Sequence, residues 1–91
     1  MQAIRTLGAI RKAVFDNVEL TNDQIIQVLS DIGEQGDIIL LKSDGIRVEN
    51  KYTVVIISGT EKFNSIRLDG AQLSQTLSAC LRSYFEALDR G

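Results

Sequence analysis

The longest apolar stretch of the chain runs from Tyr52 to Ile57 and is rich in β-branched residues. Branched side chains restrict χ1 and pack well on a pleated surface, so four consecutive Val and Ile residues favour a strand over a helix. Neither alternate set of side chains is polar enough to face bulk water. The pattern therefore predicts a central strand that is covered at least partly on both faces.

Two helices are predicted before this strand. The first covers residues 3–15, where a stripe of apolar residues recurs at helical spacing: Ala3, Leu7, Ile10 and Val14. The second begins after Thr21, because Thr21 followed by Gln24 has the pattern of a capping box. We expect it to end at Gly33, since glycine favours the left-handed conformation that terminates many helices.

A third helix is predicted at the C-terminal end. Asp69 is expected to be its N-cap and Leu88 to lie close to its end. One side of this helix is apolar and comprises Leu73, Leu77, Leu81, Tyr84, Phe85 and Leu88. No repeat or linker divides the chain, so we expect residues 1–91 to form a single α+β domain.

Between the second and third helices the apolar residues recur at period two, which predicts four strands. Their expected ranges are Asp37–Lys42, Ile46–Glu49, Tyr52–Ile57 and Phe63–Leu68. The dipeptides Asp44-Gly45 and Asn50-Lys51 suit tight two-residue turns. The expected fold is α-α-β-β-β-β-α, a four-stranded antiparallel meander with the C-terminal helix packed on one face.

Two-residue turns would fix which side chains share a face, because opposite residues in a sheet point the same way. One face would then be the apolar core, made of Ile39, Leu41, Ile46, Val48, Thr53, Val55, Ile57, Ile66 and Leu68. The other would be mixed, made of Ile38, Leu40, Lys42, Arg47, Glu49, Tyr52, Val54, Ile56, Phe63, Ser65 and Arg67.

The mixed face is the candidate functional surface. Aromatic and arginine side chains beside apolar ones are typical of protein interfaces. Its expected partner-binding residues are Lys42, Arg47, Glu49, Tyr52, Phe63 and Arg67. A second interpretation is that one of the first two helices crosses this face and leaves its charges at the rim.

Composition excludes several chemistries. The chain has no histidine, which removes the commonest general base and transition-metal ligand, and its one cysteine, Cys80, fits a helical core position. Carboxylates are dispersed among turns and caps, and the segment from Gly33 to Gly36 lacks the lysine of a phosphate-binding loop. We therefore expect no enzyme, no cofactor and no metal site.

The function predicted by these features is non-catalytic binding of another protein, by analogy with immunity proteins and inhibitors that occlude a partner. An alternative is a module that binds nucleic acid or a small ligand on the mixed face, although the net charge of −2 argues against nucleic acid. Because the first strand is apolar on both faces yet lies at a sheet edge, we also expect a homodimer. With no signal region or long apolar span in view, we expect a cytoplasmic protein without membrane contact.

Overall fold

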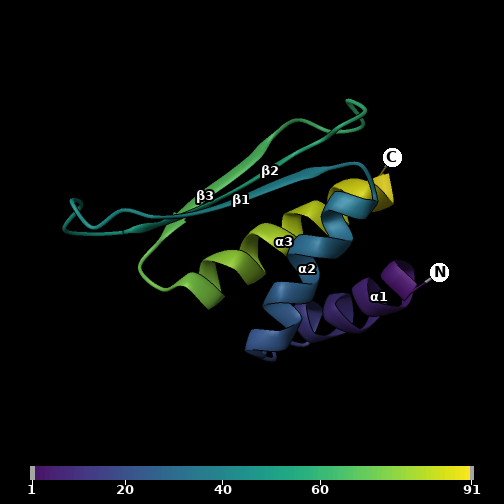
Figure 1. Ribbon diagram of the computed structural model, residues 1–91, viewed down its shortest axis with the longest axis horizontal. Helices are drawn as coiled ribbons and strands as arrows, with labels where there is room; N and C mark the ends of the chain where they lie inside the picture. The colour runs from purple at the N-terminus through teal and green to yellow at the C-terminus, as the bar shows by residue number, and fades with distance from the viewer. Residues whose placement is uncertain (1, 91) are drawn as a thin grey trace.

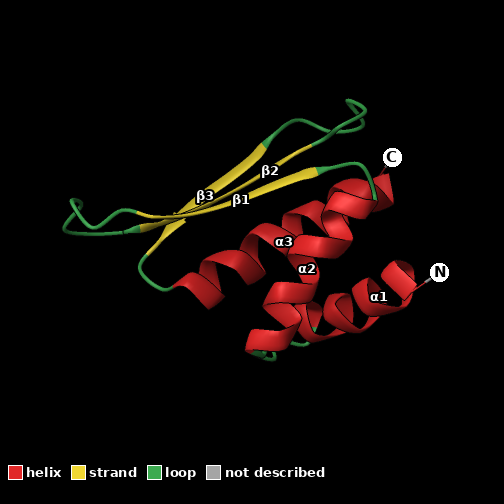
Figure 2. Ribbon diagram, viewed as in Figure 1, coloured by secondary structure: helices red, strands yellow, loops and turns green. Residues whose placement is uncertain are grey.

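The computed structural model describes residues 2–90, with side chains from residue 7 onward. In chain order its elements are α1 (Gln2–Phe15), α2 (Asn22–Glu34), β1 (Ile38–Ser43), β2 (Tyr52–Ile57), β3 (Ile66–Gly70) and α3 (Leu73–Arg90). The strands form an antiparallel sheet in the order β1-β2-β3, and the described helices all lie on one side of it (Figure 1, Figure 2). The predicted α+β class is confirmed.

The three helices form a layer under the sheet. Helix α3 packs on β2 and β3, α2 packs beside β1, and α1 packs against α2 and α3. At the start of α2, the Thr21 side chain accepts from the Gln24 N–H (3.1 Å) and the Gln24 side chain accepts from the Thr21 N–H (2.9 Å), so the predicted capping box is confirmed. The predicted end at Gly33 is wrong: the helix continues to Glu34, and the residue with positive φ is Gly36 (φ 88°).

Helix α1 agrees with its predicted range. Asn17 takes a positive φ of 58° just after the helix, and Leu7, Ile10 and Val14 face the core. Ala3, which was expected on the same stripe, lies outside the residues whose side chains the structure describes.

The expected second strand, Ile46–Glu49, does not form. Residues 44–51 are instead a loop, whose base is closed by the Asp44 N–H donating to the Lys51 C=O (2.7 Å). The Asp44 carboxylate accepts from the Ile46 N–H (3.0 Å), a short-range contact that turns the chain. The sheet described by the structure therefore has three strands where four were predicted.

The last strand and the last helix both start later than predicted. Strand β3 spans Ile66–Gly70, so Asp69 lies within the sheet and is not the N-cap of α3. At Gly70 the Thr76 side chain comes so close that an added Cβ would lie 1.9 Å from its Oγ1. Glycine thus permits the tight passage from β3 into the helix that covers it.

The long loop changes which residues of β2 face the helices. In the sheet, Ile39 pairs with Ile56 and Leu41 with Val54, and both Val54 and Ile56 are completely buried. The prediction placed the alternate residues in the core, and for β2 this is wrong. Thr53, Val55 and Ile57 point to the side of the sheet away from the helices, while Ile39, Leu41, Ile66 and Leu68 face the core as predicted.

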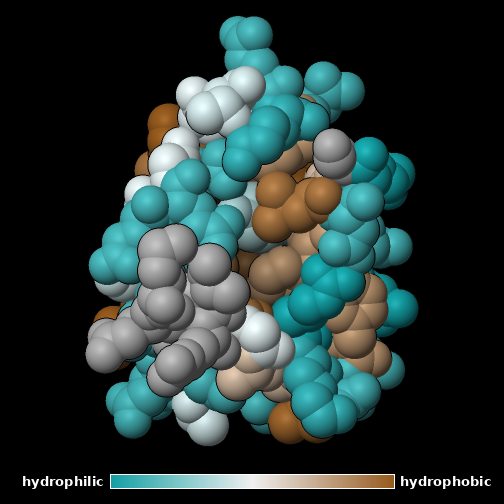
Figure 3. Space-filling view, turned by 90° about the vertical axis from the view of Figure 1, so that its right-hand side faces the viewer, coloured by the Kyte–Doolittle hydropathy of each residue, from teal (hydrophilic) through white to brown (hydrophobic). Residues whose placement is uncertain are grey.

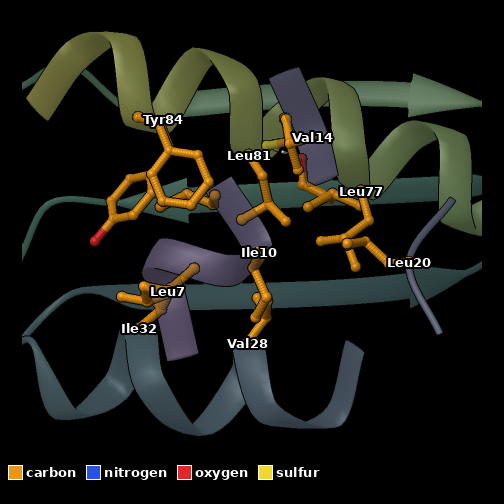
Figure 4. Packing of buried hydrophobic residues seen from close by; sticks show 13 residues of the cluster. Leu7, Ile10, Val14, Leu20, Val28, Ile32, Leu77, Leu81 and Tyr84 are labelled. Carbon is orange, nitrogen blue, oxygen red and sulfur yellow. Dashed lines mark hydrogen bonds between the residues drawn. The ribbon is translucent and has the colours of Figure 1, made fainter. Parts of the chain in front are cut away.

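The core lies between the sheet and the three helices. Figure 4 shows how α1, α2 and α3 meet there: Leu7, Ile10, Val14, Leu20, Val28, Ile32, Leu77, Leu81 and Tyr84. Tyr84 also makes the main polar contact of the core, because its hydroxyl donates to Asp37 (2.7 Å). Asp37 in turn accepts from the Gly59 N–H (3.1 Å), so one buried carboxylate joins α3 to the loops at both β1 and β2. Burial and the neighbouring Asp37 raise the pKa of Tyr84, which keeps its donor proton in place.

Candidate functional site: the outer face of the sheet

We call the side of the sheet away from the helices the outer face. The pairing register places on it Ile38, Leu40 and Lys42 of β1, Thr53, Val55 and Ile57 of β2, and Arg67 and Asp69 of β3. None of the described helices covers this face (Figure 2). Four neighbouring residues form what we call the apolar strip: Ile38, Leu40, Val55 and Ile57. Ile38 is 48% exposed and Leu40 is 54% exposed. Removing apolar side chains such as these from water lowers the free energy, so a partner that covered them would be stabilised by their burial.

One end of the outer face carries the charged cluster, which we define as Lys42, Asp44, Arg47, Arg67 and Asp69. At its centre the Arg47 guanidinium donates to the Thr53 hydroxyl (2.7 Å), and that hydroxyl donates to the Asp69 carboxylate. Arg47 also lies 3.4 Å from Asp44 (Nε to Oδ2) and 3.6 Å from Asp69 (Nη1 to Oδ1). The loop between β1 and β2 is therefore tied to the sheet through its arginine.

The neighbours of the two carboxylates in the charged cluster stabilise their ionised forms. The hydrogen bond from Thr53, together with Arg67 and Arg47, holds the pKa of Asp69 below its usual value. The Ile46 N–H, followed by the charges of Lys42 and Arg47, lowers the pKa of Asp44 in the same way. Both carboxylates are thus ionised at neutral pH, and three cations share two anions at this end of the face.

The loop that Arg47 ties down presents two apolar side chains to solvent. Ile46 is 93% exposed and Val48 is 91% exposed, one on each side of Arg47 in the chain. Figure 1 shows the hairpin of β1 and β2 extending past the start of α3, so that this loop is at one far end of the molecule. The outer face therefore combines an apolar strip, a charged cluster and a projecting apolar loop.

The structure brings together half of the predicted binding residues. Lys42, Arg47 and Arg67 meet in the charged cluster, and all three were predicted to share one face of the sheet. Tyr52 does not join them, since it shares the inner side of β2 with Val54. The other two also lie elsewhere: Phe63 packs edge-on against Tyr84 with ring centroids 5.5 Å apart, and Glu49 is exposed in the loop.

Sequence reasoning missed three members of the site. Thr53 was expected on the core side of the sheet, but it lies on the outer face. It is buried there because the Arg47 side chain covers it. Asp44 and Asp69 were interpreted as a turn residue and a helix cap. The spacing of these residues in the sequence does not indicate a shared site. They come together only because Lys42 pairs with Thr53, and Thr53 with Asp69, across the three strands.

Other parts of the described surface offer less. A hollow of about 420 Å³ lies between α3 and the connection from α1 to α2, lined by Val18, Glu19, Gln75 and Arg82 among others, and none of these charged side chains is buried. At the end of the molecule where α1 begins and α3 ends, hydrophilic residues surround a hydrophobic patch near the middle of the view (Figure 3). Within residues 2–90 no three Asp, Glu or Cys side chains converge as metal ligands would.

None of the described helices has the length and apolar character needed to cross a bilayer. Comparison of the chain with protein-family models, with curated proteins and with solved structures gave no match.

Proposed function

We propose that the chain is a non-catalytic protein-binding module and that the outer face of its sheet is the binding surface. The observation that carries the proposal is the apolar strip, which faces solvent although the helices bury the opposite side of the same strands. Exposed apolar residues gathered on one face, with arginine at the border, are typical of surfaces that another protein covers.

The partner that fits this surface is a folded protein with an apolar patch of its own. Leu40 and Val55 form the middle row of the outer face, between the Ile38–Ile57 pair and the charged cluster, and binding energy usually concentrates near the middle of an interface. Arg67 pairs with Val55 across the next ladder. Arg47 is already held by Thr53 and two carboxylates, so little side-chain entropy is lost there on binding. A surface fixed in this way is suited to occluding a partner, as immunity proteins and inhibitors do.

A nucleic-acid platform has weaker support. Such a surface needs aromatic rings on which bases can stack beside the cations that meet phosphates. Tyr52 and Phe63 lie on the inner side of the sheet, away from Arg47 and Arg67. A cytoplasmic location remains part of the proposal, and the free, buried Cys80 is compatible with it.

Site-specific photo-crosslinking in the native cell tests the proposal. A photo-reactive amino acid at Val55 should capture a protein that the same group at Ile26 does not, because Ile26 is 66% exposed but lies on α2. The captured protein is then purified and its affinity measured by calorimetry. We expect Val55→Asp to weaken binding at least tenfold, or about 1.4 kcal/mol, and Ile26→Asp to leave it nearly unchanged.

Three results would overturn the proposal. One is a purified partner that binds the parent and Val55→Asp equally well. Another is capture through Ile26 alone, which would move the binding surface to the helical layer. Loss of binding by both variants to the same extent would also contradict a surface confined to the outer face.

A further inference from the structure

We propose that a second copy of this chain pairs with the free edge of β1, antiparallel to it and centred on Leu40, so that two sheets join into one of six strands. This inference concerns the edge of the sheet and not its outer face, so it can fail independently of the proposed function. It rests on three features of β1: an unprotected edge, apolar side chains that are incompletely covered on both sides, and a self-complementary sequence.

The two edges of the sheet are built differently. β3 carries Arg67 and Asp69, and charged side chains are a common protection against strand pairing. β1 carries four apolar residues in succession, with Lys42 as its one charge. Each of its six residues has a partner in β2, so no bulge twists the strand away from a neighbour. On its other side, β1 has no strand partner within residues 2–90.

β1 is also less covered than β2 on both of its faces. Ile38 and Leu40 are exposed on the outer face, as described above. Ile39 and Leu41 face the helices, yet they are only half-buried, whereas Val54 and Ile56 beside them in β2 are completely buried. A partner on the outer face alone would leave Ile39 and Leu41 as they are. A strand added at the edge would cover both sets, because its side chains alternate between the two faces.

The sequence of β1 suits pairing with itself. Opposite residues in an antiparallel ladder share a face, so a two-fold pairing of identical strands must be centred on a residue. With Leu40 at the centre, Ile39 lies opposite the second copy's Leu41, and Ile38 lies opposite the second copy's Lys42. Apolar residues then meet on the inner face, and the two lysines stay at opposite ends.

The neighbouring registers are less favourable. A ladder centred on Lys42 sets like charges directly opposite each other, which is destabilising. One centred on Leu41 pairs Ile39 with a serine and Ile38 with an aspartate. One centred on Ile39 sets the apolar Leu41 opposite Asp37, a carboxylate that is buried and bound to Tyr84 and Gly59. The register centred on Leu40 is therefore the one the sequence favours.

A disulfide at the centre of the pairing tests this register. Residues directly opposite in an antiparallel ladder have Cα atoms about 4.5–5.5 Å apart, within the range that a disulfide spans. We expect Leu40→Cys to form a covalent dimer in a mildly oxidising glutathione buffer, and the matched variant Val55→Cys, on the same face one strand inward, to remain monomeric. The native thiol does not interfere, because Cys80 is completely buried and burial raises its pKa to about 11.

Charge variants at the same position give a second readout. Leu40→Lys and Leu40→Glu should each be monomeric by light scattering, since the two-fold sets each new charge against itself. Mixed in equal amounts they should form a heterodimer. The parent should dimerise as its concentration is raised to about 100 μM, a scale on which weak contacts are populated. Circular dichroism establishes that each variant is folded, which the exposure of Leu40 favours.

Each failure has a distinct meaning. A parent that stays monomeric at that concentration, or a Leu40→Cys variant that does not crosslink, overturns the pairing. Crosslinking of Val55→Cys in place of Leu40→Cys overturns it too, because the outer faces would then be stacked. A monomeric parent that still binds its partner through Val55 leaves the proposed function intact. If the parent is a dimer and the partner binds Val55→Asp as tightly as the parent, the proposed function is refuted and the pairing of the β1 edges stands.

Discussion

Two adjacent valines of β2 provide a sharp test of the fold, because they point to opposite sides of the sheet. Val54 faces the helices and has no exposed surface, whereas Val55 is half-buried on the outer face. The substitutions Val54→Asp and Val55→Asp are chemically identical and affect the same strand. Strand propensity is therefore matched between the variants, and the difference in stability reports which side of β2 is buried.

The expected difference is large. Val54→Asp loses about 1.5–3 kcal/mol of side-chain burial and leaves a carboxylate without a partner in the core, which costs several kcal/mol more. A chain of 91 residues has a total stability of about 5–14 kcal/mol, so this variant should be unfolded or nearly so. Val55→Asp keeps its carboxylate in solvent, next to Arg67 across the ladder, and should cost less than about 1 kcal/mol.

Urea denaturation followed by circular dichroism measures both free energies of unfolding. The parent and Val55→Asp should give cooperative transitions with similar midpoints, and Val54→Asp should give none. Equal damage by the two substitutions would refute the assignment of an open outer face. A larger loss of stability in Val55→Asp than in Val54→Asp would support the register predicted from the sequence, in which Val55 lies in the core.

Three further predictions follow from single contacts. Tyr84→Phe should lower the free energy of unfolding by about 1–3 kcal/mol in urea melts, because Asp37 loses its buried donor; an unchanged midpoint would contradict that hydrogen bond. Gly59→Ala should also destabilise, since its Cβ would lie 1.7 Å from the Gly36 carbonyl oxygen, and a melting temperature equal to the parent's would be inconsistent with that approach. The carboxyl pKa of Asp69, measured by NMR titration, should lie below the usual value of about 3.9. The contribution of Asp69 to stability is then complete above about pH 4 and is lost as the pH falls through the lowered pKa. A normal or raised pKa would rule out the contacts of Asp69 with Thr53 and the arginines.

The helices could be predicted from sequence because their signals are local. Thr21 and Gln24 are three residues apart, and the stripe of Leu7, Ile10 and Val14 repeats with the turn of the helix. Asn17 likewise takes the positive φ that its residue type tolerates. Each of these features is decided by residues within one or two turns of each other.

The strand register could not be predicted in the same way. The turn at Asp44-Gly45 was assigned from a dipeptide preference, but Asp44 accepts from the Ile46 N–H, and Arg47 is held by Thr53 and Asp69. The short-range contact of Asp44 and the contacts of Arg47 with residues outside the loop accompany one long loop in place of two short turns. Because side chains alternate along a strand, the change moves every residue of β2 to the opposite face.

The candidate site was predicted in part for the same reason. Lys42 and Arg67 lie on strands whose faces were assigned correctly, and both reach the charged cluster. Tyr52 was placed on the wrong side because it lies on β2, the strand whose phase depends on the loop. Homodimerisation and partner binding stay predictions, although β1 does lie at a sheet edge.

The footprint of the partner on the protein tests the central claim most directly. Amide chemical shifts of the labelled chain are recorded by NMR as the purified, crosslink-identified partner is added. Binding through the outer face should shift the amides of β1, β2 and the loop at residues 44–51, and leave the exposed side of α2 around Ile26 unchanged. Shifts confined to the helices, with the strands unaffected, would contradict the assignment of the outer face as the binding surface.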